Sequence, residues 1–172
     1  MKSKFIPDYI FPSYRAITPA FLREVGIRGL LVDIDNTLAP YEVAEPDDEI
    51  RAWVKALTED GVKIAFVSNN HPPRVELFNR TLGLPAYPDA AKPLKKKPMQ
   101  ALAELGTAKE ETATLGDQIF TDVWTGRALG LRTILVPPIK DKRDPFTRFK
   151  RLLERRYIRA YAKNALKEKE NQ

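Results

Sequence analysis

The feature that most constrains the fold is an apolar run that ends on two closely spaced aspartates. Residues 29–32 are Gly-Leu-Leu-Val, and Asp33 and Asp35 follow with one isoleucine between them. Continuous apolar runs of this length are typical of strands buried on both faces of a parallel sheet. Residues two apart in an extended chain point the same way, so both carboxylates face one spot. Such a pair is costly to bury unless a cation or a proton lies between the carboxylates.

Further apolar runs alternate with helical patterns along the chain, and prolines and glycines mark their ends. Strictly alternating strands and helices with short links predict an α/β fold: a doubly wound, five-stranded parallel sheet with helices on both faces. The expected strands are 28–34, 62–67, 85–87, 112–115 and 132–136, and the expected helices are 20–25, 47–59, 73–82, 92–105 and 122–129.

Length and charge divide the chain into a sheet domain and a basic tail. The chain has 172 residues, a formal net charge of +6 and no cysteine, which excludes disulfides, thiolate metal sites and cysteine nucleophiles. Residues 140–172 contain 12 Lys or Arg against 5 Asp or Glu, so the positive charge belongs to this end. We therefore predict a domain over 1–139, which ends after two prolines, and a tail over 140–172.

The pattern of apolar and basic residues in the tail predicts a basic amphipathic helix over about 144–167. Such a helix either lies on an anionic interface or packs its apolar stripe against the sheet domain. A basic tail suits anionic lipid and, less well, nucleic acid, although a solvated helix without a partner is an equal alternative. No window approaches the roughly 20 apolar residues of a membrane span, so we expect any contact with a membrane to be peripheral, on its inner face. The absence of cysteine fits a cytoplasmic protein. The stripe consists of Phe146, Phe149, Leu153, Tyr157 and Tyr161.

Polar side chains follow four of the predicted strands. Because the carboxyl ends of parallel strands meet at one edge, these residues should share the crevice where open α/β sheets bind ligands. Several carboxylates without cysteine favour a hard, oxygen-preferring ion such as Mg²⁺. A lysine and a serine hydroxyl are then suitable donors to the oxygens of a bound phosphate. The set is Asp33 and Asp35, Ser68, Lys92, and Asp117 with Asp122.

Two assignments at this edge have alternatives. Lys97-Pro98 repeats the pair Lys92-Pro93, but Lys92 is favoured because the strand at 85–87 and a short loop lead directly to it. Asn69 either donates a hydrogen bond to the phosphate or serves as a turn residue.

These segments resemble the four motifs of the haloacid dehalogenase superfamily of aspartate-nucleophile phosphatases. They occur in the same order, each after an apolar strand, and cover roughly residues 28–136. The chain is also similar to the YqeG group of subclass IIIA, in its segments 17–19, 91–93 and 116–118 and its basic ending near 148–156. The four motifs correspond to Asp33-Ile34-Asp35-Asn36-Thr37, Ser68, Lys92-Pro93 and the segment 116–122.

The resemblance implies an Mg²⁺-dependent phosphomonoester hydrolase that acts through an aspartyl-phosphate. Asp33 would be the nucleophile, and Asp35 the general acid and base. Mg²⁺ would bind the Asp33 carboxylate, the backbone carbonyl of Asp35 and Asp117. The residues that would hold the transferring group or support the site are Ser68, Lys92, Asp122 and Thr37.

The predicted elements leave no room for a lid domain between the motifs, because 37–62 holds a loop and one helix, and 70–92 holds one helix and a short strand. An open site suits a large substrate, or one that is covered by a partner. The YqeG group resembles the phosphatases that convert phosphatidylglycerophosphate to phosphatidylglycerol. The resemblance therefore implies a phosphorylated lipid as the leading substrate, with the basic helix on an anionic bilayer.

Two alternatives belong to other classes. One is an RNA- or ribosome-associated binding module that uses the basic tail and has only vestigial or unrelated phosphatase activity. The other is a response-regulator receiver domain, which also gathers acids, a hydroxyl and a lysine on a parallel sheet. The receiver places its phosphorylated aspartate after the third strand, where this chain offers no suitable aspartate, so this interpretation ranks last.

Overall fold

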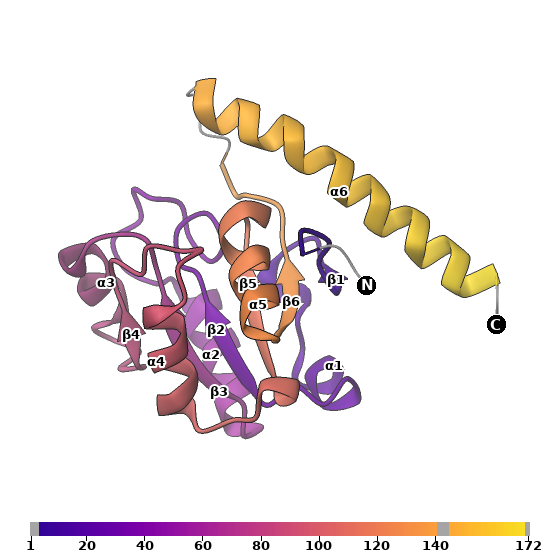
Figure 1. Cartoon of the computed structure of the whole chain (residues 1–172). Coiled ribbons are helices and arrows are strands. Elements are labelled where there is room, and N and C mark those ends of the chain that lie inside the picture. Colours follow the sequence, from indigo (N-terminus) through magenta and orange to yellow (C-terminus); the bar gives the residue numbers. More distant parts are fainter. Residues whose placement is uncertain (1–3, 141–144, 171–172) are drawn as a thin grey trace.

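A wholly parallel sheet of six strands lies at the centre of the protein, in the order β1-β6-β5-β2-β3-β4. Figure 1 shows this arrangement in a computed structural model that describes residues 4–140 and 145–170. The strands are β1 (Tyr9–Ile10), β2 (Gly29–Val32), β3 (Lys63–Val67), β4 (Ala86–Tyr87), β5 (Thr112–Gly116) and β6 (Arg132–Leu135).

The predicted doubly wound parallel sheet is confirmed, but the predicted number of five strands is wrong. The additional strand is β1, which extends the sheet beyond β6. Asp8 holds this edge in place, because its Oδ2 accepts hydrogen bonds from the backbone N–H of Thr133 at 2.9 Å and from Thr133 Oγ1 at 3.1 Å. A strand of two residues shows no periodicity in the sequence, and its partner lies 125 residues away.

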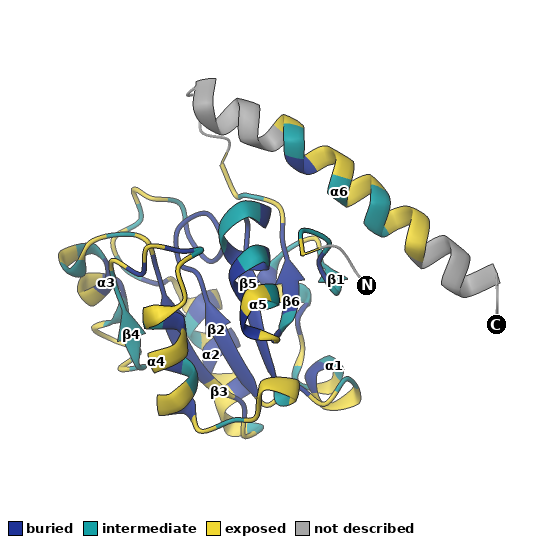
Figure 2. Ribbon diagram, in the orientation of Figure 1, coloured by how far each residue is buried: buried dark blue, intermediate teal, exposed yellow. Residues whose placement is uncertain are grey.

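Helices cover both faces of the sheet, as predicted (Figure 1). The side chains of each central strand alternate between two cores: Leu30 and Val32 point to one face, and Leu31 points to the other. The central strands are buried, the edge strands β1 and β4 are half-buried, and the outer sides of the helices are exposed (Figure 2). One face carries α1 (Pro19–Glu24), α2 (Asp48–Glu59) and α3 (Pro72–Asn79), and the other carries α4 (Lys96–Leu105) and α5 (Trp124–Leu129).

Helix α4 begins four residues later than predicted, at Lys96 instead of Lys92. Pro98 therefore lies in the first turn, where the missing N–H of a proline leaves no hydrogen bond of the helix unmade. Because the helix begins later, Lys92 lies in the loop between β4 and α4.

The carboxyl edge of the sheet carries no inserted domain within residues 4–140. Between β2 and β3 the chain forms a loop and α2. Between β3 and β5 it forms α3, β4, α4 and a short 3-10 turn, η2 (Lys109–Glu111). The ligand-binding edge of the sheet is therefore open.

A long helix, α6 (Pro145–Glu170), follows the sheet. The side chains of Phe146 and Phe149 from the predicted stripe lie outside the described residues. Tyr157 is half-buried, and its ring centroid lies 5.1 Å from that of Phe5 and 6.1 Å from that of Phe120. This part of α6 thus contacts the sheet domain. Across the described part of the chain, none of the helices has the length and apolar character that crossing a bilayer requires.

Candidate active site

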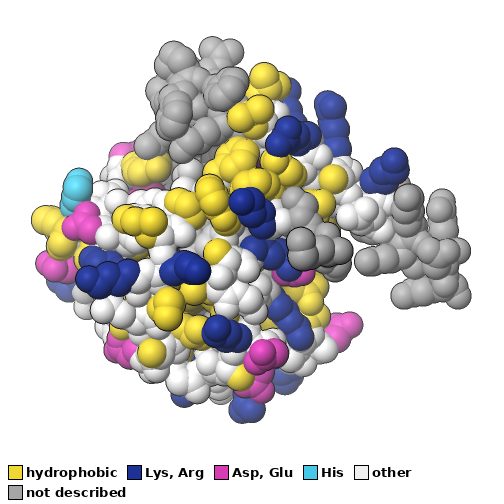
Figure 3. Space-filling model, in the orientation of Figure 1, with side chains coloured by type: hydrophobic (Ala, Val, Ile, Leu, Met, Phe, Trp, Pro, Cys, Tyr) yellow, Lys and Arg dark blue, Asp and Glu magenta, His cyan; other side chains and the backbone are white. Residues whose placement is uncertain are grey.

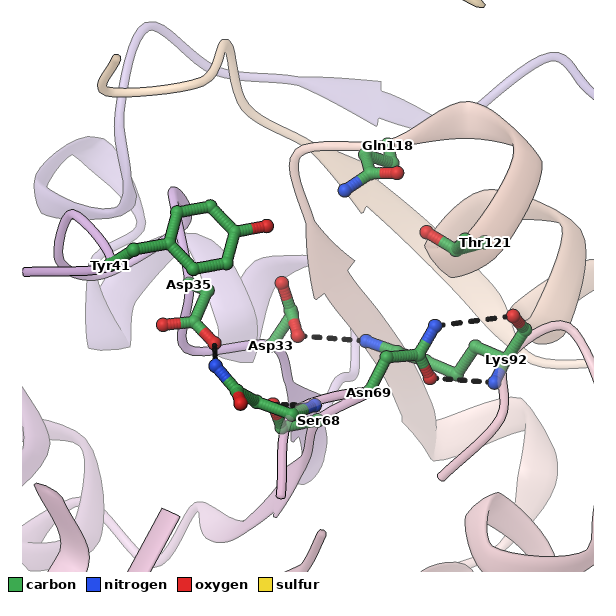
Figure 4. A pocket seen from close by; sticks show the side chains of 9 residues that line it. Asp33, Asp35, Tyr41, Ser68, Asn69, Lys92, Gln118 and Thr121 are labelled. Atoms are coloured by element: carbon green, nitrogen blue, oxygen red, sulfur yellow. Dashed lines mark hydrogen bonds and ion pairs between the residues drawn. The ribbon is translucent and has the colours of Figure 1, made fainter. Parts of the chain in front are cut away.

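A pocket of about 260 Å³ opens at the carboxyl edge of β2, β3 and β5. Its lining includes five of the residues predicted from the sequence, which come from three separate loops (Figure 4). Four further residues line it that the sequence analysis did not single out: Tyr41, Asn70, Gln118 and Thr121. The five predicted residues are Asp33, Asp35, Ser68, Asn69 and Lys92.

Asp33 and Thr37 are brought together by a tight turn after β2. The backbone N–H of Asp33 still donates to Leu115 of β5 at 2.9 Å, so this residue is held by the sheet. The chain then turns at Asn36, whose φ is +63°, a left-handed conformation in which asparagine is enriched. The turn places Thr37 Oγ1 3.5 Å from Asp33 Oδ2, a long hydrogen bond.

Lys92 bridges two buried carboxylates. Its Nζ lies 2.9 Å from Asp33 Oδ1 and 2.6 Å from Asp122 Oδ1. Burial by itself lowers the pKa of Lys92, but the ion pairs with Asp122 and Asp33 outweigh burial and raise the pKa above its usual value. Lys92 therefore stays protonated, as a cation facing the predicted nucleophile.

Asn69 holds the backbone of Lys92. Its Oδ1 accepts a hydrogen bond from the backbone N–H of Lys92 at 2.7 Å, and its Nδ2 donates to the Lys92 carbonyl at 3.2 Å (Figure 4). Both polar ends of the Asn69 side chain thus hold the loop that carries Lys92. Asn69 also lines the pocket, so its contact with the phosphate stays a prediction. Lys97 Nζ donates instead to the carbonyl of Pro88, so Lys92 and not Lys97 reaches the carboxylates.

Asp122 reaches the site because β5 continues into a single π-helical turn, η3 (Ile119–Val123). Its Oδ2 accepts hydrogen bonds from the backbone N–H of Gln118 at 3.1 Å and from Thr121 Oγ1 at 3.2 Å. This side chain packs directly on Gly116, where a Cβ would come within 2.1 Å of Asp122 Cγ. A glycine at the end of β5 is therefore required for Asp122 to fold back toward Lys92.

The carboxylates of Asp33, Asp117 and Asp122 form a buried cluster, each with an oxygen within 4.8 Å of one from each of the others. The pKa of Asp33 is raised to about 8, chiefly because the carboxyl is buried; Lys92 opposes this rise, and the charges of Asp122 and Asp117 add to it. One ammonium does not balance three carboxylates. The donor set, carboxylate oxygens only, matches the preference of Mg²⁺, so these residues fit the predicted ion.

Asp35 is held by two residues that the sequence analysis missed. Its Oδ1 pairs with Arg74, 3.1 Å from Nη2 and 3.2 Å from Nε, and its Oδ2 accepts from Asn70 Nδ2 at 2.8 Å. The guanidinium of Arg74 also lies over the ring of Phe78, 5.1 Å from its centroid. No local pattern marks Arg74, because it meets Asp35 only once α3 packs against the sheet.

Comparison with known proteins gives matches over most of the chain. A model of the haloacid dehalogenase-like hydrolase family matches residues 14–130. The chain is 36% identical over 160 residues to the "Probable phosphatase YqeG" of Bacillus subtilis (strain 168), covering 93% of each protein. It is 27% identical to the "Phosphatidylglycerophosphate phosphatase 1, chloroplastic" of Chlamydomonas reinhardtii, with 84% of this chain but only 57% of that protein covered.

Two solved structures share the fold. An uncharacterized protein from Listeria monocytogenes serotype 4b superposes with a TM-score of 0.54 at 18% identity, over 69% of this chain and 85% of the other. The cobalt-bound deoxy-D-mannose-octulosonate 8-phosphate phosphatase of Haemophilus influenzae gives a TM-score of 0.50 at 12% identity, over 80% of this chain and 90% of the other. The family match spans every strand end that builds the pocket, so this chain belongs to the haloacid dehalogenase-like hydrolases.

Proposed function

We propose that this protein is a phosphatase that hydrolyses phosphomonoesters, with Asp33 as its nucleophile and Mg²⁺ as its metal. The observation that carries the proposal is the buried cluster of Asp33, Asp117 and Asp122 with Lys92 bridging two of its members. A carboxylate nucleophile is repelled by a phosphate dianion unless positive charge lies between them. The Bacillus subtilis relative named as a probable phosphatase supports the same activity.

Asp33 and Asp35 would divide the chemistry. The Asp33 carboxylate attacks phosphorus, the bond from phosphorus to the ester oxygen breaks, and the leaving oxygen takes a proton from Asp35. Asp35 then removes a proton from water, whose oxygen attacks the phosphorus of the aspartyl-phosphate. The bond from phosphorus to the Asp33 oxygen breaks, which releases inorganic phosphate and restores the Asp33 carboxylate. Arg74 and Asn70 keep the Asp35 side chain in one orientation for both steps.

The transferring group would be held by Ser68 and Lys92. Ser68 Oγ accepts a hydrogen bond from the backbone N–H of Asn70 at 3.0 Å, which leaves its own O–H to donate to a phosphate oxygen. Asp33, Asp117 and the backbone carbonyl of Asp35 would hold Mg²⁺, which offsets negative charge between nucleophile and phosphate. Asp122 orients Lys92 through their 2.6 Å contact.

As the substrate we propose a phosphorylated lipid, with phosphatidylglycerophosphate first among candidates. The open edge of the sheet admits a large molecule, and apolar side chains border the motif loops: Tyr41, Leu94 and Ile139 are 36%, 66% and 44% exposed. The name of the Chlamydomonas reinhardtii relative indicates the same lipid for that protein. A peripheral position on the cytoplasmic face of a membrane belongs to this proposal.

The exposed side of α6 would face the anionic lipid. Arg155, Arg159 and Lys163 are exposed at spacings of four residues, so they form one row along the helix. Figure 3 shows Lys and Arg side chains along the described part of α6, beside a group of hydrophobic side chains. The same basic row favours a second candidate function, binding of RNA, which is also a polyanion.

A hydrolysis assay with Mg²⁺ tests these proposals. Wild type and Asp33→Asn are compared on vesicles that contain phosphatidylglycerophosphate and on soluble sugar phosphates. We expect phosphate release by the wild type only, and much faster release from the vesicles. Equal release by both proteins removes Asp33 as the nucleophile, and equal or preferred turnover of soluble esters removes the lipid substrate. Salt-dependent RNA binding by both proteins, without any hydrolysis, favours the binding module instead.

A further inference from the structure

Helix α6 carries a buried carboxylate, Glu154, at a position that is followed by exposed residues. Glu154 is 3% exposed, whereas Arg155 and Arg156 directly after it lie in solvent. A carboxylate at this depth is expensive unless it accepts hydrogen bonds or pairs with a cation. Glu154 Oε1 accepts a hydrogen bond of 2.8 Å from the backbone N–H of Ile119.

Ile119 is the first residue of η3, the turn that carries Asp122. The first N–H groups of a helical turn have no acceptor within the turn and need one from outside. Gln118, at the cap position, makes no side-chain hydrogen bond of this kind. Glu154 therefore supplies, from 35 residues further along the chain, the acceptor that the local sequence lacks. Because this acceptor is a carboxylate, the hydrogen bond is charge-assisted.

A chain of short contacts leads from this hydrogen bond to the proposed nucleophile. Within the turn, the backbone N–H of Asp122 donates to the carbonyl of Gln118 at 2.9 Å, and the N–H of Gln118 donates to Asp122 Oδ2 at 3.1 Å. Asp122 Oδ1 then contacts Lys92 Nζ at 2.6 Å, and Lys92 Nζ contacts Asp33 Oδ1 at 2.9 Å. A shift of Ile119 would therefore move Asp122 and, through it, the ammonium of Lys92.

Aromatic contacts hold the same turn against α6. Tyr157, three residues after Glu154 and hence on the same side of the helix, packs with Phe120 of η3. Phe5 packs against both rings, with its ring centroid 5.1 Å from that of Tyr157 and 5.3 Å from that of Phe120. In Figure 1, α6 runs past the side of the sheet formed by β6 and β1.

We propose that Glu154 is a positioning residue of the active site, which holds η3 so that Asp122 stays paired with Lys92. The inference rests on the proposed phosphatase function. Through the Glu154 contact, the ordered arrangement of the pocket depends on the packing of α6 against the sheet domain, so the predicted tail is part of the catalytic unit. Partners around a metal site that only orient its ligands typically contribute about 10- to 100-fold in activity or metal affinity.

Three variants of the full chain test the proposal. Glu154→Ala removes the acceptor, Glu154→Gln keeps an acceptor oxygen without the charge, and Asn164→Ala is a control at an exposed position of the same helix, outside the basic row. Amide hydrogen exchange in metal-free protein reports the order of residues 117–123. Phosphatase assays over a range of Mg²⁺ concentrations report kcat, KM and the Mg²⁺ concentration that gives half-maximal rate.

We expect Glu154→Ala to speed exchange at 119–123 and to lower kcat or raise the required Mg²⁺ by about 10- to 100-fold, with little change in KM. Glu154→Gln should recover most of both effects, and Asn164→Ala should match wild type. Unchanged exchange and kcat in Glu154→Ala overturn the proposal. So does faster exchange spread evenly over the whole chain, which indicates a general loss of stability.

Two further outcomes are decided by the same set of proteins. If Glu154→Ala does not fold, Glu154→Asp replaces it, since its shorter side chain withdraws the carboxylate from Ile119. Slower turnover together with faster exchange at 119–123 in Glu154→Asp, compared with Glu154→Gln, supports the proposal, and equality with Glu154→Gln overturns it. If even wild type hydrolyses no phosphomonoester, the proposed function fails, while exchange at 119–123 still decides the role of Glu154.

Discussion

Replacing Lys92 with methionine tests how the pocket balances its charges. Methionine keeps an unbranched stem but removes the ammonium, which lies 2.9 Å from Asp33 and 2.6 Å from Asp122. With an effective dielectric constant of about 20, each contact corresponds to about 6 kcal/mol of Coulomb attraction. The cost of burying the ammonium offsets much of that attraction. Breaking a buried pair by removing one partner typically costs about 3–5 kcal/mol, and we expect this loss of unfolding free energy above pH 8.

The loss should be smaller at lower pH. Burial already raises the pKa of Asp33 to about 8 while Lys92 lowers it, so the variant has a still higher pKa. When the pKa of a carboxyl is higher in the folded chain than in the unfolded chain, the protein loses unfolding free energy as the pH rises toward the folded-state pKa. Wild type stops losing stability from Asp33 near pH 8, whereas the variant continues to lose it, by up to about 1.4 kcal/mol per pH unit.

Urea unfolding of metal-free protein at about pH 7 and about pH 9 measures both quantities. Lys97→Met is the matched control, because Lys97 donates to the carbonyl of Pro88 outside the carboxylate cluster. The reasoning is refuted if Lys92→Met is as stable as wild type at both values of pH. It is also refuted if the variant loses more stability at the lower pH.

Three further predictions concern the same pocket. Gly116→Ala should displace Asp122, since the new Cβ would lie 2.1 Å from Asp122 Cγ. Strain of this kind costs about 1–3 kcal/mol of unfolding free energy. An unchanged melting temperature and kcat would contradict this prediction. Mg²⁺ affinity, measured by calorimetry, should rise by up to about tenfold per pH unit from pH 6 to pH 8. The reason is that a proton competes with the ion for Asp33, whose pKa is raised to about 8, chiefly by burial. An affinity that does not change with pH would rule this competition out. Arg74→Met should release Asp35 and lower kcat by about 10- to 100-fold with little effect on KM, and kcat equal to that of wild type would show that the ion pair does not serve catalysis.

Local pattern was sufficient for the central strands and for most of the site. The run before Asp33 is long and apolar enough to mark a buried strand, and a spacing of two places both aspartates at its end. Parallel strands bring their carboxyl ends to one edge, so Ser68, Lys92 and Asp117 could be assigned to the same crevice before any contact was known.

The missing pieces are those whose partners lie far along the chain. Strand β1 is two residues long and depends on Asp8 and Thr133, 125 residues apart. Arg74 meets Asp35 from 39 residues away, through the packing of α3. Neither contact leaves a periodic signal in its own segment.

The sequence alone therefore specifies the parallel α/β architecture, the family and the acids at the strand ends, because burial and spacing within one segment encode them. Tertiary structure decides which lysine pairs with Asp33, how η3 folds Asp122 back over Gly116, and that Glu154 of α6 caps this turn. Those outcomes depend on distances between segments, and such distances exist only after the helices have packed on the sheet.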